Sequence, residues 1–161
     1  GSDLILKRMK RRHSRAGALA TIARARTLRP GIAIGADLIA GFPTETDALF
    51  AETLAFVEQA ALPYLHVFPY SERPGTPAAR MPPVPVVQRR ERAARLRETA
   101  RRHAAHFHAG LVGCQVAVLV ERDGVGRSEH FSPVRSIVGR PGAVVRARIA
   151  GADADGLITA A

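Results

Sequence analysis

One stretch constrains the fold more than any other: residues 37–46, which read Asp-Leu-Ile-Ala-Gly-Phe-Pro-Thr-Glu-Thr. An apolar, β-branched run over residues 32–39 stops at a glycine and a proline, and a helical pattern follows over residues 46–60. A strand, a tight loop and a helix in this order form the unit of an α/β fold. The same pattern recurs around residues 64–71, so two strand ends are expected to present their loops on one rim, where such folds place their chemistry.

The remaining elements follow from periodicity and from turn residues. Helices are predicted over residues 4–12, 14–28 and 87–111. Ser14 is expected to cap the second of them, which would bury Leu19, Ile22 and Ala23, and Thr44 and Asp47 to form a capping box for the helix over 46–60. The helix over 87–111 is expected to bury an apolar stripe containing Leu96 and to carry Arg89 and Arg92 on its other faces. Past Gly110 the pattern changes to short strands, predicted over residues 114–120, 125–131, 134–138, 143–149 and 157–159. Five short strands predict a small closed β-barrel of the oligonucleotide-binding kind.

Charge points to an anionic partner. The chain has 24 Lys and Arg against 14 Asp and Glu, a formal charge of +10, and every cation except Lys7 and Lys10 is arginine. Because the guanidinium group binds phosphate in a planar, bidentate manner, nucleic acid is the favoured partner. The alternative is that the charge reflects coding bias and only keeps the chain in solution.

A single cysteine, Cys114, excludes an internal disulfide and any multi-cysteine metal or iron–sulfur site made by this chain alone. It is expected to pack in the core as a small hydrophobic residue, and the cytosol is the default compartment. No apolar run has the length of a membrane span, and no export signal is visible, so no membrane partner is expected. The chain begins at Gly1 without a methionine, which leads us to expect a fragment.

Four sequence motifs carry a family resemblance. They are Gly1-Ser2-Asp3 with Leu6 and Met9, residues 37–46, residues 66–71 (His-Val-Phe-Pro-Tyr-Ser) and residues 73–79 (Arg-Pro-Gly-Thr-Pro-Ala-Ala). With these motifs in order, the chain resembles the C-terminal part of a radical SAM methylthiotransferase of tRNA. The resemblance implies a mixed α/β and β architecture. Residues 1–84 would form the later βα units of a radical SAM partial TIM-like barrel, residues 85–110 a linking basic helix, and residues 111–161 an RNA-binding TRAM β-barrel.

The sequence of residues 66–81 is most similar to that of the branch that acts on N6-threonylcarbamoyladenosine in tRNA. That branch adds a methylthio group to C2 of the adenosine next to the anticodon. Branches that act on isopentenyladenosine in tRNA, or on an aspartate of a ribosomal protein, share most of these motifs and stay open. A rival of another class is a stand-alone RNA-binding module that needs no cofactor.

The resemblance also implies cofactors. The full enzyme would use S-adenosylmethionine, whose reductive cleavage yields a 5′-deoxyadenosyl radical, and two 4Fe-4S clusters, one held by a Cys-x-x-x-Cys-x-x-Cys motif. Neither set of cluster cysteines is present in this chain. We therefore expect the chain alone to bind no cluster and to be inactive, with the missing N-terminal part of the enzyme as its partner besides tRNA.

Candidate site residues follow from the same resemblance. The cofactor would contact two strand ends and the loop after the first, at Asp37, Ile39, Gly41, Glu45, His66 and Phe68. The competing interpretation is that a βα turn needs its glycine and that an isolated histidine and aromatic residues belong to the core. Position 44 is usually glycine in the family and is threonine here, which carries a steric cost if this site requires a positive φ.

RNA contacts are expected at cations and at one aromatic residue, with a merely solvated surface as the alternative: Arg11, Arg12, Arg127, His130, Phe131, Arg135, Arg146 and Arg148. For Arg11 and Arg12, together with Lys10, the cofactor carboxylate is a second candidate partner. Arg146 and Arg148 alternate with apolar residues, so both are expected to point outward from their strand. Finally, the strand over 32–39 would present an unpaired apolar edge, which predicts association or partial disorder of the isolated chain.

Overall fold

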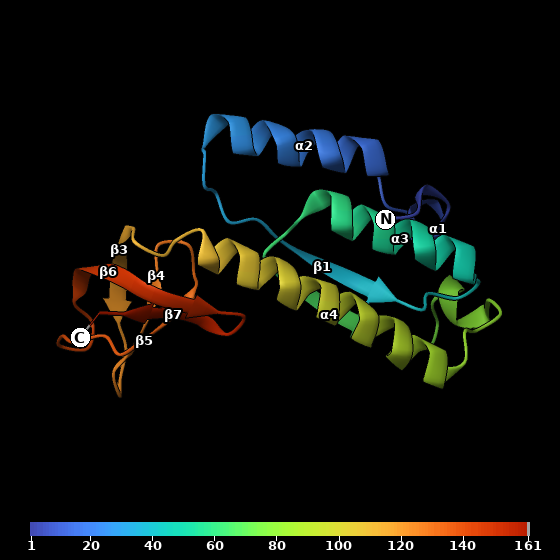
Figure 1. Ribbon diagram of the computed structural model, residues 1–161. Coiled ribbons are helices and arrows are strands. Elements are labelled where there is room, and N and C mark those ends of the chain that lie inside the picture. Colours follow the sequence, from blue (N-terminus) through green and yellow to red (C-terminus); the bar gives the residue numbers. More distant parts are fainter. Residues whose placement is uncertain (161) are drawn as a thin grey trace. The chain divides into compact units, whose positions relative to one another are not determined.

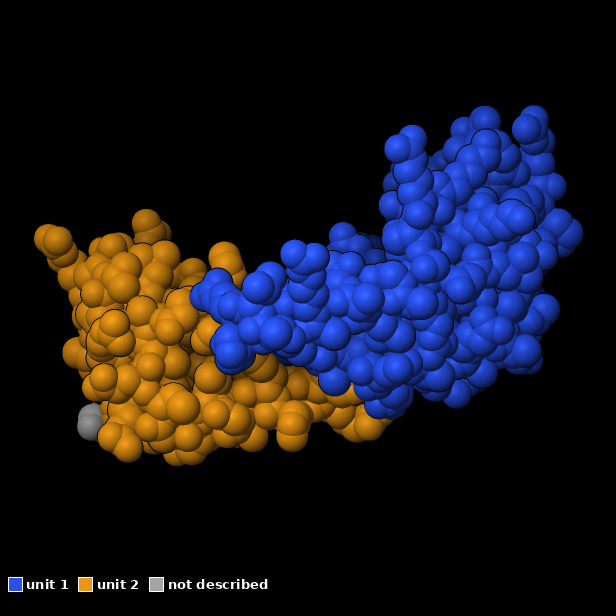
Figure 2. Space-filling model, turned by 90° about the horizontal axis from the view of Figure 1, so that it is seen from above, with its two compact units in different colours: residues 1–100 blue, residues 101–161 orange. Residues whose placement is uncertain are grey.

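The computed structural model describes residues 1–160, and the chain divides into two compact units, residues 1–100 and 101–161 (Figure 2). The first unit contains α1 (Asp3–Arg8), α2 (Arg15–Leu28), β1 (Gly35–Ala40), α3 (Asp47–Ala60), β2 (Tyr64–Pro69) and the 3-10 turn η1 (Pro77–Arg80). Helix α4 (Val86–Ala109) begins in the first unit and ends in the second. The second unit continues with β3 (Gln115–Val120), β4 (Val125–Ser128), β5 (Pro133–Arg135), β6 (Val144–Asp153) and β7 (Gly156–Thr159) (Figure 1).

Two parallel strands, β1 and β2, form the sheet of the first unit and are joined through α3. Apolar residues on one face of this sheet, including Ala40 and Val67, pack with Phe50 and Val57 of α3 and with Leu96 of α4. This is the strand, helix, strand order expected from the sequence. The larger barrel that the resemblance implies stays a prediction.

Helix α3 begins two residues later than a capping box at Thr44 would require. Thr46 is the N-cap, and its side chain accepts a hydrogen bond from the backbone N–H of Leu49. Thr44 instead has a φ of 66°, in the left-handed region, and an N-cap residue needs an extended backbone. The predicted capping box of Thr44 and Asp47 is therefore wrong. Because the φ of Thr44 is positive, threonine at this position carries the steric cost expected for that case.

The two N-terminal helices are shorter or less buried than predicted. Helix α1 ends at Arg8, not residue 12, because Lys10 adopts a φ of 55°. Helix α2 has the predicted cap at Ser14 but no fully buried residue, and Ala23, expected on its buried face, is exposed. Arg26 attaches α2 to the C-terminal end of α3 by donating to the carbonyls of residues 60 and 61 at 2.8 and 2.9 Å.

Helix α4 buries two arginines that its sequence pattern predicts on exposed faces. Arg89 and Arg92 are 7% and 5% exposed, on the same side of the helix as Leu96. A third arginine, Arg97, donates to the carbonyl of Val67 at 2.8 Å and so satisfies one acceptor of β2. The first unit thus uses arginine side chains of α4 to satisfy backbone carbonyls of its strand and loops.

The second unit is the closed five-stranded barrel that the sequence predicts, with strand order β3-β4-β5-β7-β6. Its core contains Val118, Val134, Ile149 and Leu157. Strand β4 ends at Ser128, earlier than predicted, and β6 extends to Asp153 through an irregularity between residues 149 and 151. Cys114 lies before β3 and is exposed, so its predicted place in the core is wrong.

Candidate functional site

Four of the six predicted cofactor residues lie on one face of the β1–β2 sheet. Asp37 pairs with His66, and Ile39 pairs with Phe68. Because side chains alternate along a strand and register partners in parallel strands point the same way, all four face away from the core face that carries Val67. Phe68 is 54% exposed, and Asp37 and His66 are also exposed. This face offers an apolar surface flanked by a carboxylate and an imidazole.

Gly41, the fifth candidate, lies directly after β1 with a φ of 73°. A Cβ atom at this position would come within 2.6 Å of Cγ of Arg89. The glycine is therefore required both by the backbone conformation and by the close approach of α4. Its contact with a cofactor stays a prediction.

Glu45, the sixth candidate, is buried and has its carboxylate bonded inside the protein. Its Oε2 accepts from the backbone N–H of Gly41 at 2.9 Å and from Nη1 of Arg92 at 3.0 Å. Burial raises the pKa of Glu45 above its ordinary value, while the Gly41 N–H and the Arg92 charge act in the opposite direction. This geometry gives Glu45 a structural role in holding the loop after β1, and direct contact with a cofactor stays a prediction.

Two residues that sequence reasoning missed complete this support. Arg92 also donates to Oδ1 of Asp47 at 2.7 Å, and its guanidinium lies 5.5 Å from the ring centroid of Phe50. Arg89 donates through Nε to the carbonyl of Val84 at 2.6 Å and lies over the ring of Tyr70.

A signal for both arginines was present in the sequence. Arg89, Arg92 and Leu96 have helical spacing of three and four residues, which places the cations in line with the buried stripe of α4.

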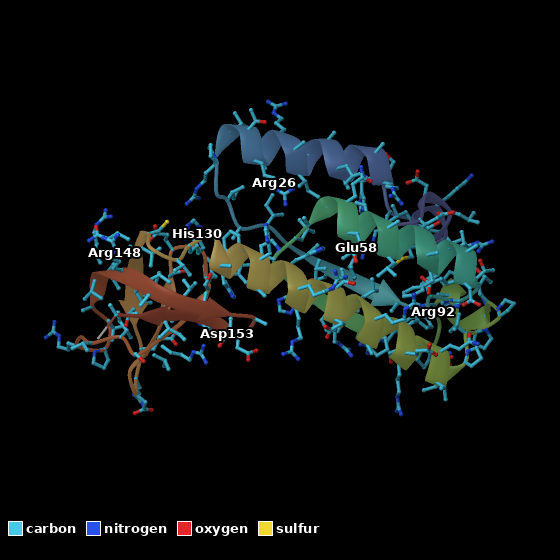
Figure 3. All side chains as sticks on the ribbon, in the orientation of Figure 1. Arg26, Glu58, Arg92, His130, Arg148 and Asp153 are labelled. Carbon is cyan, nitrogen blue, oxygen red and sulfur yellow. The ribbon has the colours of Figure 1, made fainter. Side chains whose placement is uncertain are left out.

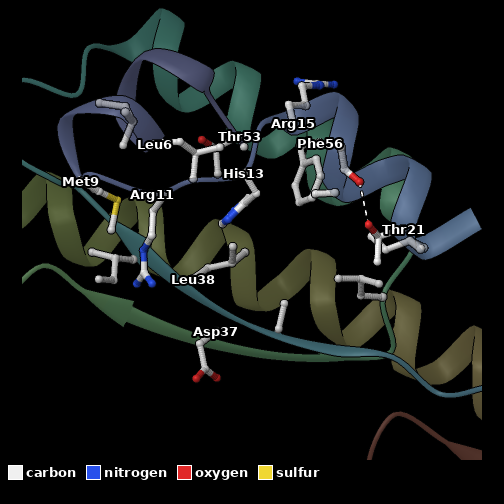
Figure 4. Close-up of a pocket in the computed structure, with 18 of the residues that line it drawn as sticks. Leu6, Met9, Arg11, His13, Arg15, Thr21, Asp37, Leu38, Thr53 and Phe56 are labelled. Carbon is white, nitrogen blue, oxygen red and sulfur yellow. Dashed lines mark hydrogen bonds between the residues drawn. The ribbon is translucent and has the colours of Figure 1, made fainter. Parts of the chain in front are cut away.

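A cavity of about 590 Å³ lies between α1, α2, α3 and β1 in the first unit (Figure 4). In Figure 4, Arg11 and His13 reach toward β1, and the Asp37 carboxylate points away on the other side of the strand. Four predicted site residues, Arg11, Asp37, Ile39 and Glu45, border this cavity among mostly apolar neighbours. Its size is in the range of small-molecule sites. Arg12, the neighbouring candidate, is exposed and is not part of the lining.

On the barrel, three predicted RNA contacts lie on the outer faces of β4 and β6, the two strands that pair with β3. Arg127 faces Leu119 across the strands, Arg146 faces Ala117, and Arg148 faces Gln115. All three arginines are exposed, which confirms the predicted outward direction of Arg146 and Arg148. Arg148 is labelled in Figure 3. Arg127 has an acidic neighbour in Glu121 at 3.8 Å, so part of its charge is already balanced.

The other three barrel candidates differ from one another. Arg135 forms an ion pair with Asp153 at 2.5 Å, and this hydrogen bond is the main cause of the lowered pKa of Asp153. His130 lies against the ring of Phe107, with centroids 5.8 Å apart. Phe131 is 77% exposed. Arg135 is thus engaged within the barrel, while Phe131 is presented to solvent.

Residues 1–160 contain neither a ready metal-binding cluster nor a membrane-spanning helix. In that part of the chain no cluster of three or more histidine, cysteine or acidic side chains has the geometry to bind a metal ion. Nor is any helix of the described residues long and apolar enough to cross a membrane.

Comparison with known proteins identifies the relatives of this chain, although no family model matches it. The chain is 49% identical over 135 residues to threonylcarbamoyladenosine tRNA methylthiotransferase MtaB of Rickettsia prowazekii, a match that covers 84% of this chain and 32% of that protein. It is 41% identical over 167 residues to the tRNA-2-methylthio-N(6)-dimethylallyladenosine synthase of Ruegeria pomeroyi, covering 98% of this chain and 38% of that protein. The synthase of the same name from Methylococcus capsulatus is 45% identical over 122 residues, which cover 75% of this chain and 27% of that protein.

The chain thus spans about a third of the length of the curated relatives it matches. Along that third, it belongs to the tRNA methylthiotransferase family.

Proposed function

We propose that this chain is the C-terminal part of a tRNA methylthiotransferase that adds a methylthio group to C2 of N6-threonylcarbamoyladenosine. The observation that carries the proposal is the 49% identity to an enzyme named for that nucleoside. The synthases named for dimethylallyladenosine match at 41% to 45% identity, which makes their nucleoside the second candidate substrate.

The open face of the β1–β2 sheet fits the adenosyl part of S-adenosylmethionine. Ile39 and Phe68 offer an apolar surface on which adenine can lie, and the exposed Asp37 carboxylate can accept hydrogen bonds from ribose hydroxyls. His66 lies beside Asp37 and adds a further polar group. S-adenosylmethionine supplies the radical chemistry of the reaction when bound, and these residues bind and orient it.

A 4Fe-4S cluster does not fit this chain. The sequence contains one cysteine, Cys114, and it belongs to the barrel unit, not to the α/β unit. Cluster ligands would come from another part of the enzyme, and the chain alone is proposed to be inactive.

The barrel is proposed to bind tRNA through its outer cationic face. Arg146 and Arg148 project from one strand at a two-residue interval, and Arg127 lies on the same outer face of the sheet. Arginine in this arrangement favours contact with backbone phosphates, which positions an RNA without reading its sequence.

The proposal is tested by disrupting the gene that encodes this chain and measuring tRNA nucleosides by mass spectrometry. We expect loss of 2-methylthio-N6-threonylcarbamoyladenosine and unchanged levels of the dimethylallyl derivative. The opposite pattern would support the second substrate. If both nucleosides persist, the tRNA methylthiotransferase proposal is wrong, and a stand-alone RNA-binding module or a ribosomal-protein modifier takes its place.

Complementation tests the sheet face. Restoring the gene with Asp37→Asn should lower the modified nucleoside by roughly tenfold or more, because the carboxylate acceptor is lost. Asp123→Asn is the matched control, since Asp123 is also an exposed acid, in a barrel turn with a φ of 60°, which asparagine tolerates. Equal recovery with both variants would argue against a cofactor at Asp37.

A further inference from the structure

The turn between β4 and β5, residues 128–132, is held by a dense set of hydrogen bonds. The hydroxyl of Ser128 accepts from the backbone N–H groups of His130 and Ser132, both at 3.2 Å. The Ser128 carbonyl accepts from the N–H of Phe131 at 2.8 Å, and the Ser128 N–H donates to the Ser132 carbonyl at 3.0 Å. Ser128 and Ser132 are themselves buried. This turn is therefore a fixed part of the barrel.

The three side chains at its tip have different surroundings. The Glu129 carboxylate accepts from the backbone N–H of Ala117, so it points back onto the barrel. The His130 ring packs edge-to-face against Phe107. Phe131 extends into solvent with 77% of its surface exposed.

Phe131 is also held in an unfavourable backbone conformation, with a φ of 61°. A bulky side chain in the left-handed region is strained, and a large apolar group in water adds a hydrophobic cost. Glycine or asparagine would satisfy this turn better on both counts. Strained residues that surrounding bonds hold in place cluster at ligand-binding sites.

The turn adjoins the cationic face of the barrel. The backbone N–H of Ala117 on β3 binds the Glu129 carboxylate of the turn, and Ala117 is the register partner of Arg146 on β6. Two residues away on β3, Gln115 is the register partner of Arg148. Proteins bind unpaired nucleotides by stacking an aromatic ring on the base and pairing cations with the phosphate, and this part of the barrel offers an exposed ring at Phe131 and exposed guanidinium groups at Arg146 and Arg148.

We propose that Phe131 stacks on an unpaired base of RNA and that Ser128 is the positioning residue that holds it there. This inference rests on the proposed tRNA-binding role of the barrel and adds to it the kind of nucleotide recognised. The ring needs a free base face, so the site takes single-stranded segments such as loops and excludes paired stems. Stacking also tolerates any base, so little sequence preference is expected.

The absence of tryptophan from the chain provides a direct test. In Phe131→Trp, the indole is the only tryptophan, and titration with a single-stranded RNA oligonucleotide should quench its fluorescence. The same oligonucleotide annealed to its complement should not. Val138→Trp is the matched control, because Val138 is 86% exposed on the same barrel but lies in another loop.

Affinity measurements separate stacking from charge. At fixed salt, Phe131→Leu should weaken binding of single-stranded RNA roughly 5- to 150-fold, the range expected for one stacked base. The dependence of affinity on salt concentration should be unchanged, because no cation is removed. Ser128→Ala should weaken binding in the parent chain and have no further effect in the Phe131→Leu background, with thermal unfolding confirming that the barrel remains folded.

The possible failures are distinct. If the chain binds single-stranded RNA but the indole at position 131 is not quenched, or if Phe131→Leu binds normally, the inference is wrong while the proposed function stands. If paired RNA quenches the indole equally, the selectivity for unpaired bases is refuted. If the chain binds no RNA, both this inference and the tRNA-binding role of the barrel fail, and the nucleoside measurements above then judge the enzymatic proposal alone.

Discussion

Replacing Arg92 with methionine tests the central support of the candidate site, the buried ion pair between Arg92 and Glu45. The two side chains are 6% and 1% exposed, and their charged atoms lie 3.0 Å apart. Methionine keeps much of the side-chain volume but leaves the Glu45 carboxylate buried without its cation. Breaking a buried pair in this way typically costs about 3–5 kcal/mol. Because Arg92 also bonds the exposed Asp47 and contacts Phe50, we expect a value of about 3 kcal/mol or more.

The loss should depend on pH with a definite sign. Burial raises the pKa of Glu45 in the folded state, so the folded protein holds this proton more tightly than the unfolded chain does. For Glu45, stability is therefore gained as pH falls through the window between the unfolded and folded pKa values. Removing Arg92, which opposes the rise, moves the folded pKa higher still. The destabilisation by Arg92→Met should thus be largest near neutral pH and shrink as the solution is acidified.

The assay exploits the position of the tyrosines. The chain has two, Tyr64 and Tyr70, and both belong to the first unit. Urea unfolding followed by tyrosine fluorescence therefore reports on that unit alone, at about pH 7.5 and about pH 5.5. Arg90→Met is the matched control, since Arg90 is exposed on the same helix and should change stability by no more than about 0.5 kcal/mol.

A double variant completes the measurement. Adding Glu45→Gln to Arg92→Met removes the unpaired charge and should restore about 1–2 kcal/mol. Two results would refute the reasoning: a loss below about 1 kcal/mol in Arg92→Met, or a loss that stays constant between the two pH values.

Two further predictions concern the loop after β1 and the barrel surface. Gly41→Ala should destabilise the first unit by more than about 2 kcal/mol, because the new Cβ would meet Cγ of Arg89 at 2.6 Å. Gly75 has a φ of 82° but open space around it, so the control variant Gly75→Ala should cost only about 1 kcal/mol. Equal losses in the two variants would contradict the proposed clash. On the barrel, Arg148→Gln should reduce the slope of log affinity against log salt concentration for single-stranded RNA by about 0.7. Arg135→Gln should change this slope less, because Arg135 is already ion-paired with Asp153. A larger effect at Arg135 would place the RNA on another face of the barrel.

Burial in the folded protein gives a structural role to two arginines that look like surface charge in the sequence. Sequence composition presents Arg89 and Arg92 as two cations among many, in a chain with a formal charge of +10. In the folded protein Arg92 binds the loop after β1 through the Glu45 carbonyl, and Arg89 binds the segment after β2 through the Tyr70 carbonyl. The basic composition of this chain therefore combines buried structural arginines with exposed ones, and only the burial of individual residues distinguishes the two kinds.

Local patterns in the sequence were sufficient for much of the fold. The strand, loop and helix order of the first unit and the five strands of the barrel follow from hydrophobic periodicity and turn residues, which depend on neighbours in the chain. The outward direction of Arg146 and Arg148 follows for the same reason, since alternation along a strand is a local property.

Local patterns failed where distant groups decide the outcome. Thr44 looked like a cap but is in the left-handed region, where its N–H donates to the carbonyl of Pro82, and Cys114 looked like a core residue but precedes its strand.

What the sequence by itself determined is the identity of the elements and the motifs that mark the family. Only the tertiary structure decided how the candidate residues are used. It placed Asp37 and His66 together on an open sheet face, bonded Glu45 to Arg92, and left Phe131 exposed on a fixed turn. The physical reason is that periodicity reports which side of an element is apolar, whereas burial, ion pairing and the free energy of a strained turn depend on residues far apart in the chain.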